Sequence, residues 1–71
     1  LIGAQVRLGY NRIEDIAAWL REHGLEKYVA VFAENEIELR DAPHLNDADL
    51  TQLGLPMGPR KRFVAAAAKL I

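Results

Sequence analysis

The sequence predicts an all-α domain in which several short helices are followed by a longer one at the C-terminus. Apolar residues recur at spacings of three and four along most of the 71-residue chain, as on the buried side of helices. Glycine, proline and asparagine separate these stretches at positions that suit helix ends. The hydrophobic fraction of 51% is sufficient for a packed core and argues against disorder. No internal repeat or pair of strands is evident.

Residues 1–10 are the least regular segment of the chain. Apolar residues alternate weakly with polar or small ones, while two glycines argue against a stable helix. The residues concerned are Val6, Leu8 and Tyr10, with Gly3 and Gly9. We expect residues 1–10 to be an N-terminal arm or linker and residues 11–71 to be the helical domain. Since the first residue is leucine, we also expect the chain to be a fragment of a longer protein.

The first two predicted helices are joined by a very short connection. Asn11 can cap the first, with Glu14 completing a capping-box pattern, and Gly24 can end it. The second follows at once and ends near Asn35. Their apolar sides are Ile13, Ile16, Ala17, Trp19 and Leu20 in the first helix, and Leu25, Tyr28, Val29 and Phe32 in the second. The two helices must pack antiparallel or at a steep angle.

The next segments are a single helical turn and a short helix. Leu39 to Ala42 can form the turn, which we expect Pro43 to end because proline has no amide N–H. Asn46 can then cap a helix, with Asp49 three residues later. The apolar side of this helix is Leu50 and Leu53, and Gly54 stops it.

The last helix is predicted to have Pro59 at its first position, where the missing N–H needs no partner. Its apolar stripe is Phe63, Ala66, Ala67 and Leu70. The alanine run from Ala65 to Ala68 favours helix and lets neighbouring elements approach closely.

Charge is strongly segregated along the chain. All ten acidic residues lie in residues 14–49, where three bases leave a net charge of −7, whereas residues 50–71 hold four bases and no acid. Arg60, Lys61 and Arg62 are consecutive near the start of the last helix, where the helix dipole is already positive. This placement favours an anionic partner, and the acidic middle of a second copy is one candidate. The alternative is an ordinary solvated helix end.

The residue types present give little support to catalysis or to a metal or cofactor site. The chain has no cysteine and no serine, and Thr51 is its single threonine. His23 and His44 are far apart, without the spacing of a metal site. We therefore expect no enzyme activity and no cofactor. The absence of cysteine fits an intracellular, cytoplasmic protein, and no apolar run approaches the length of a membrane span.

Ordered motifs over residues 11–71 resemble the sterile alpha motif (SAM) family. They are Asp15-Ile16-x-x-Trp19-Leu20, Gly24-Leu25-x-x-Tyr28-x-x-x-Phe32, Asn35-Glu36-Ile37, Leu45-Asn46-Asp47-x-Asp49-Leu50-x-x-Leu53-Gly54-Leu55, and Gly58-x-Arg60-x-Arg62-x-x-x-x-x-Ala68-x-Leu70. The segment Glu34-Asn35-Glu36-Ile37 and the alanine-rich last helix are similar to bacterial SAM domains of multidomain signalling proteins. Two features depart from the family pattern: Asn11, where many members carry a tryptophan nearby, and Pro59.

The resemblance implies a compact bundle of about five helices that acts as a protein–protein interaction module. Many members join an end-helix surface to the mid-loop surface of another copy or another SAM domain, giving homo-oligomers or open polymers that serve as signalling scaffolds. Here the end-helix surface would be Met57, Gly58, Arg60, Lys61 and Arg62. The mid-loop surface would be Glu34, Glu36, Glu38, Asp41, Asp47 and Asp49.

Alternative interpretations remain for both surfaces. Asp47 and Asp49 have a local explanation near a helix start, and the other acids can be solubilising surface. Some SAM domains bind RNA hairpins through basic residues at the start of the last helix. Phosphate binding strengthens with the number of cations, and an otherwise acidic domain repels a long polyanion. A structural spacer or a membrane-surface contact has less support still, because the basic cluster is small.

Overall fold

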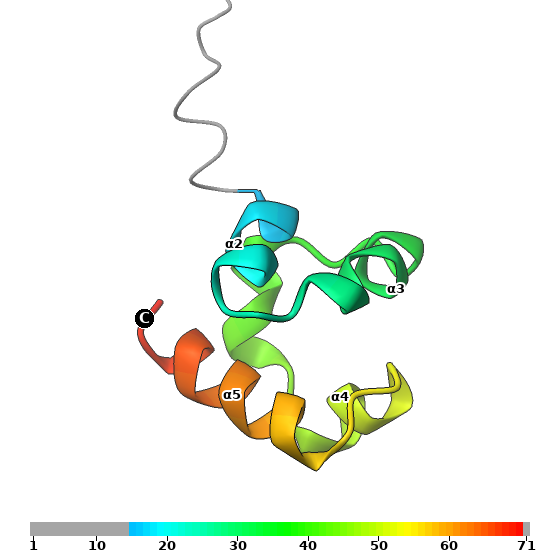
Figure 1. Cartoon of the computed structure of the whole chain (residues 1–71), viewed down its shortest axis with the longest axis vertical. Coiled ribbons are helices and arrows are strands. Elements are labelled where there is room, and N and C mark those ends of the chain that lie inside the picture. The colour runs from blue at the N-terminus through cyan, green and yellow to red at the C-terminus, as the bar shows by residue number, and fades with distance from the viewer. Residues whose placement is uncertain (1–14, 71) are drawn as a thin grey trace, which may run out of the picture.

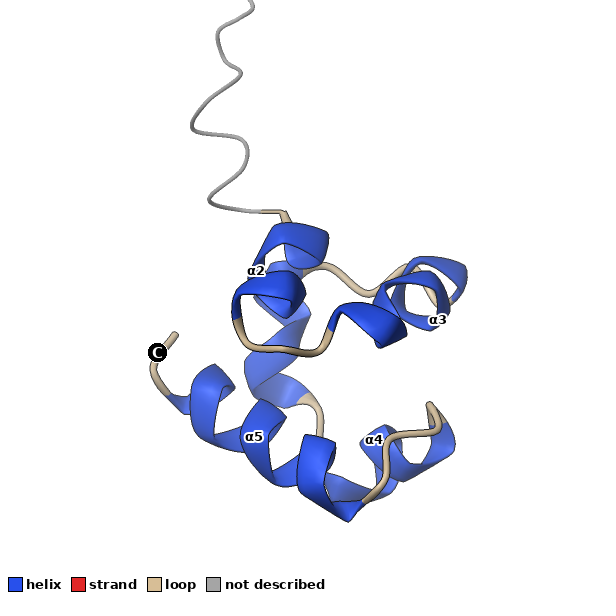
Figure 2. Ribbon diagram, in the orientation of Figure 1, coloured by secondary structure: helices blue, strands red, loops and turns tan. Residues whose placement is uncertain are grey.

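The structure is a computed structural model that describes residues 15–70, which contain only helices and loops (Figure 2). The elements in chain order are α2 (Ile16–Glu22), the 3₁₀ helix η3 (Glu26–Tyr28), α3 (Val29–Glu34), the 3₁₀ helix η4 (Leu39–His44), α4 (Asp47–Gln52) and α5 (Met57–Ala68). Figure 1 shows α5 as the longest element, following α4 closely. The all-α prediction and the longer last helix are thus confirmed.

Two phenylalanines and a tryptophan form the centre of the core. The Phe63 ring of α5 meets the Trp19 ring of α2 edge-on, with centroids 5.2 Å apart, and lies 5.6 Å from the Phe32 ring of α3. Ala66 and Ala67 of α5 are buried beside them. The remaining buried apolar residues are Leu20, Leu25, Tyr28, Ala42, Leu50 and Leu55. Helices far apart in the sequence are therefore held by one shared apolar cluster.

Helices α2, α3 and α4 all end in the same Schellman motif, in which the chain turns back toward the core. In each, the second residue after the capping position donates its N–H to a carbonyl in the last turn of the helix. These bonds are Leu25 to Leu20 at 2.7 Å, Ile37 to Phe32 at 3.0 Å and Leu55 to Leu50 at 3.0 Å. The motif needs one residue with positive φ, which is Gly24 at 73°, Glu36 at 56° and Gly54 at 98°.

The first two helices differ in detail from the sequence-based prediction. The predicted cap at Asn11 and its partner Glu14 lie outside the described residues. The described helix α2 begins at Ile16, and the Asp15 side chain accepts a hydrogen bond from the Ala17 amide at 2.9 Å. The predicted second helix opens as a 3₁₀ turn, η3, and becomes α-helical at Val29.

Two prolines occupy positions that the sequence analysis placed wrongly. Pro43 lies inside η4, which continues to His44, because its fixed φ suits a 3₁₀ turn and one lost hydrogen bond is tolerable in so short an element. Pro59 is the third residue of α5, since the helix begins at Met57. The amide of Arg60 is the first to donate within this helix, to Pro56 at 3.0 Å. Pro59 therefore still lies where an N–H has no helical partner.

Candidate interaction surfaces

The five residues expected to form the end-helix surface all lie within the first six residues of α5. Met57 is 63% exposed and is the most exposed large hydrophobic residue in the described part of the chain. Gly58, Lys61 and Arg62 are also exposed, whereas the Arg60 side chain is mostly buried. The surface therefore combines a projecting apolar side chain with two solvent-facing cations.

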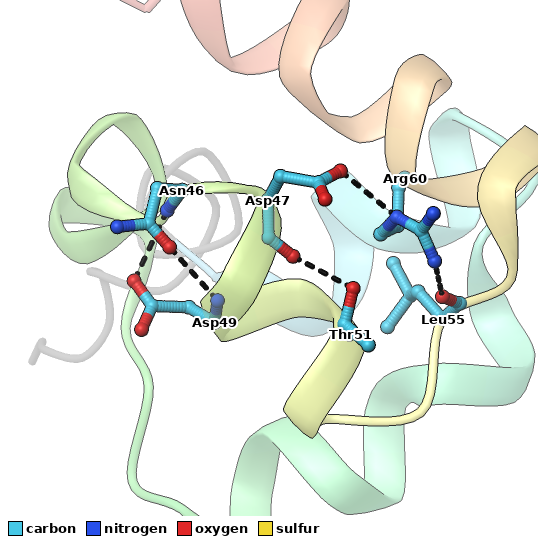
Figure 3. A network of polar contacts seen from close by, with 6 residues as sticks. All are labelled: Asn46, Asp47, Asp49, Thr51, Leu55 and Arg60. Atoms are coloured by element: carbon cyan, nitrogen blue, oxygen red, sulfur yellow. Dashed lines mark hydrogen bonds and ion pairs between the residues drawn. The ribbon is translucent and has the colours of Figure 1, made fainter.

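Arg60 is held inside the chain by a network that we call the Arg60 bridge: Asp47, Leu55 and Arg60 (Figure 3). The guanidinium Nε lies 2.9 Å from the Asp47 carboxylate Oδ1, and Nη1 donates to the Leu55 carbonyl at 2.8 Å. The Arg60 side chain is only 18% exposed, against 76% for Asp47. Two residues that the resemblance assigns to opposite binding surfaces are thus paired with each other in one chain.

Two more acids of the mid-loop surface make local hydrogen bonds. The Asp49 carboxylate accepts from the Asn46 amide at 3.0 Å, and the Asn46 side chain accepts from the Asp49 amide at 2.8 Å (Figure 3). This reciprocal capping box starts α4 as the sequence predicted. Asp41 likewise accepts from the Glu38 amide at 2.8 Å at the start of η4. Both carboxylates therefore stabilise helix starts, whatever else they bind.

Glu38 forms an ion pair with Arg40 at the surface. The two side chains approach to 2.7 Å, yet they remain 62% and 82% exposed, respectively. Exposed pairs of this kind contribute about 0–1 kcal/mol because water and salt screen them. The pair lowers the local negative charge without removing Glu38 from the surface.

Glu34 and Glu36 are the mid-loop acids whose carboxylates form neither an ion pair nor a hydrogen bond among the described residues, and both are exposed. Glu34 ends α3, and Glu36 follows it in the left-handed conformation that the Schellman motif requires. The other two motifs place glycine at this position. For a residue with a Cβ, the left-handed conformation costs about 1–2 kcal/mol. Glu36 is therefore a locally strained residue. We call Glu34 and Glu36 together the acidic corner.

A shallow groove of about 420 Å³ lies between the end of α3 and α4. Its lining residues are Asn35, Ile37, Leu45, Asp49, Gln52 and Leu53. Ile37, Leu45 and Leu53 are apolar and only partly buried. This groove was not predicted from the sequence, although Leu53 was assigned to the apolar side of its helix. The sequence feature that indicates it is the apolar residue after each Schellman turn. After α3 this residue is Ile37, which lies close to α4.

Of the two histidines in the sequence, His23 lies against an aromatic side chain of the core. His23 packs against the Trp19 ring with centroids 5.0 Å apart. Within residues 15–70 no group of three or more His, Cys, Asp or Glu residues is arranged to hold a metal ion. In the same residues, no helix has the length and apolar character needed to cross a membrane.

Comparison with known proteins identifies the family. The model described as "SAM domain (Sterile alpha motif)" matches residues 9–70. The chain is 34% identical over 64 residues to the Homo sapiens "Ankyrin repeat and SAM domain-containing protein 3", covering 89% of the chain and 10% of that protein. It is 36% identical over 58 residues to the Danio rerio "Ankyrin repeat and SAM domain-containing protein 6", covering 80% of the chain and 8% of that protein. No solved structure matches the chain.

These relatives are eukaryotic, so the similarity to bacterial members stays a prediction. The boundary expected between residues 10 and 11 also stays a prediction, although the family match begins at residue 9. The matched residues take in every element of the described fold. The chain therefore belongs to the sterile alpha motif family, whose members are generally protein–protein interaction modules.

Proposed function

We propose that this SAM domain self-associates head to tail, with the start of α5 in one copy bound to the acidic corner after α3 in another. The main support for this proposal is the location of charged side chains that have no partner within the described part of the chain. Lys61 and Arg62 on one side, and Glu34 and Glu36 on the other, form no ion pair among the described residues. Opposite charges on separate surfaces of one chain are complementary between copies, and they steer association.

Apolar contact supports the same pairing. Met57 projects beside the two cations, and the groove lined by Ile37, Leu45 and Leu53 lies beside the two acids. A flexible thioether side chain can pack on these three apolar residues without requiring a preformed pocket. Burial of a central apolar side chain inside a charged rim is the common anatomy of a stable interface.

The proposed contact joins two different surfaces, so it is heterologous. Each copy that binds through its α5 start still offers a free acidic corner, and the association can continue into a filament or close into a ring. We therefore expect the average mass to rise steadily with concentration. A partner that is a different SAM domain is the alternative within the same mode of binding.

The test uses one charge reversal on each surface. Lys61→Glu and Glu36→Lys are each expected to lower self-association at least about tenfold, because both create like-charge contacts. A 1:1 mixture keeps one intact pair of surfaces and should form a complex, measured by sedimentation velocity in low salt. Lys69→Glu, the same change at the far end of α5, is the control that should associate as the wild type does.

Three results would contradict the proposal: a wild-type protein that stays monomeric at high concentration and low salt, unaltered association of Lys61→Glu, or a mixture of the two variants that stays monomeric. If the wild-type protein is monomeric but binds a different SAM domain through the same residues, the partner is that domain and not a second copy of this chain.

RNA-hairpin binding has less support from the geometry. The Arg60 bridge leaves Lys61 and Arg62 as the solvent-facing members of the basic triplet. Phosphate affinity depends steeply on the number of cations that contact the backbone, and two give little binding at physiological salt. A gel shift with a panel of short hairpins at low salt is expected to show no retarded band.

A further inference from the structure

The start of α5 lacks the usual stabilising features of a helix N-terminus. Pro56 occupies the capping position and makes no side-chain hydrogen bond, and the first turn contains no acidic residue. The cations that follow add to the positive end of the helix dipole. The surface that we propose to bind a partner is therefore built on a helix start that needs support from elsewhere.

The Arg60 bridge supplies that support. Asp47 is the first residue of α4, and Leu55 lies in the turn that connects α4 to α5. One guanidinium therefore ties three segments together: the start of α4, the connecting turn and the fourth residue of α5 (Figure 3). A planar group with donors in a fixed fork suits this role, whereas a lysine ammonium is a single point charge.

We infer that Arg60 is a positioning residue, which holds the start of α5 against α4 so that Met57 and Lys61 are presented to the partner. It does not itself bind the partner's acids. This inference rests on the proposed head-to-tail contact and assigns different roles to neighbouring members of the basic triplet. Arg60 is mostly buried and internally bonded, while Lys61 is exposed beside it.

The two possible roles of Arg60 predict opposite effects of Asp47→Asn. If Arg60 bound the partner's acids directly, removing the Asp47 charge would free the guanidinium and tighten the complex. If Arg60 is a positioning residue, the same change loosens the start of α5 and weakens the complex. Asp47 is exposed, so replacement by its amide should leave the fold intact.

The experiment places this substitution in one defined copy of the mixed complex. The Glu36→Lys copy supplies the intact basic surface, and the Lys61→Glu copy supplies the intact acidic corner. Asp47→Asn added to the Glu36→Lys copy is expected to weaken binding about three- to tenfold, since it replaces a charge-assisted hydrogen bond to Arg60 by a weaker neutral one. The same substitution in the Lys61→Glu copy is the control for direct contact by Asp47, and a smaller loss is expected there.

Hydrogen exchange of the monomeric Glu36→Lys copy gives a readout that does not depend on binding. Arg60→Gln and Asp47→Asn should each speed exchange of the backbone amides at positions 60 and 61 at least about threefold, because only the start of α5 loosens. The amides of Leu20 and Phe32 should be unchanged. Arg62→Gln, the same loss of charge on the exposed side of the helix, should change none of them.

The outcomes separate the inference from the function on which it rests. Equal or tighter binding after Asp47→Asn in the basic-surface copy overturns the positioning role, as does a loss confined to the other copy. Unchanged exchange at the start of α5 overturns it as well. If the two parent variants fail to bind each other, the head-to-tail function is wrong, and faster exchange would then support only the structural part of the inference.

Discussion

Replacing Glu36 by glycine is expected to stabilise the domain while weakening its self-association. Glu36 has φ of 56° at a helix end where the equivalent positions after α2 and α4 are Gly24 and Gly54. Relief of the left-handed strain contributes about 1–2 kcal/mol. Glycine loses more backbone entropy on folding, which costs about 0.5–1 kcal/mol. At the midpoints of these two ranges, the net gain in the free energy of unfolding is about 0.75 kcal/mol.

The assay is thermal unfolding followed by circular dichroism, at a protein concentration low enough to keep the chain monomeric. For a domain of this size, the expected gain corresponds to a rise in Tm of about 3–6 °C. Glu34→Gly is the matched control because it removes the same charge two residues earlier, at the last right-handed position of α3. There glycine should lower the stability by about 0.5–1 kcal/mol.

A Tm for Glu36→Gly equal to or below that of the wild type would refute the reasoning from backbone strain. Glu36→Gln separates the two effects, because it keeps the strain and removes the charge. We expect Glu36→Gln to leave the Tm nearly unchanged and to weaken self-association as much as Glu36→Gly does. Opposite signs for stability and binding would mark Glu36 as a residue whose side chain serves the interface at the expense of the fold.

Three further predictions concern the core, a helix cap and the binding surface. Phe63→Ala should cost about 3–5 kcal/mol, because its ring contacts Trp19 and Phe32, and this is close to the whole stability of so small a domain. Circular dichroism should then show a largely unfolded chain. Asp49→Ala removes one half of the α4 capping box and should cost about 1 kcal/mol, read as a lower urea midpoint with an unchanged slope. Met57→Asp should leave the Tm nearly unchanged, because the side chain is exposed, and should lower self-association in sedimentation velocity.

The sequence predicted most of the helices because each carries its own local signals. The stripe ending at Phe32, the Asn46 and Asp49 cap, and the stops at Gly24 and Gly54 depend on residues only a few positions apart. Such signals can be read without knowing the tertiary structure. The placements of Pro43 and Pro59 were wrong because a proline fits several positions in a short turn or a first turn, and packing selects among them.

The charged surfaces were only partly predictable. The segregation of acids and bases is visible in the sequence. The sequence does not show which of these charges are free to bind a partner. The structure divides the charges, because Asp49 and Asp41 bind helix-start amides and Asp47 binds Arg60, thirteen residues away. A pairing over that distance depends on how α5 packs against α4, which no local pattern reports.

The sequence alone determined the all-α class, the order of the helices and the opposite charges of two segments, because these follow from composition and short-range spacing. Which of these charges remain exposed depends on the tertiary structure. It seated the Arg60 guanidinium between Asp47 and the Leu55 carbonyl, gathered Ile37, Leu45 and Leu53 into one groove, and left Met57 projecting from the start of α5. Burial and ion pairing join residues that are far apart in the chain, and the packing of the helices sets the distances between them.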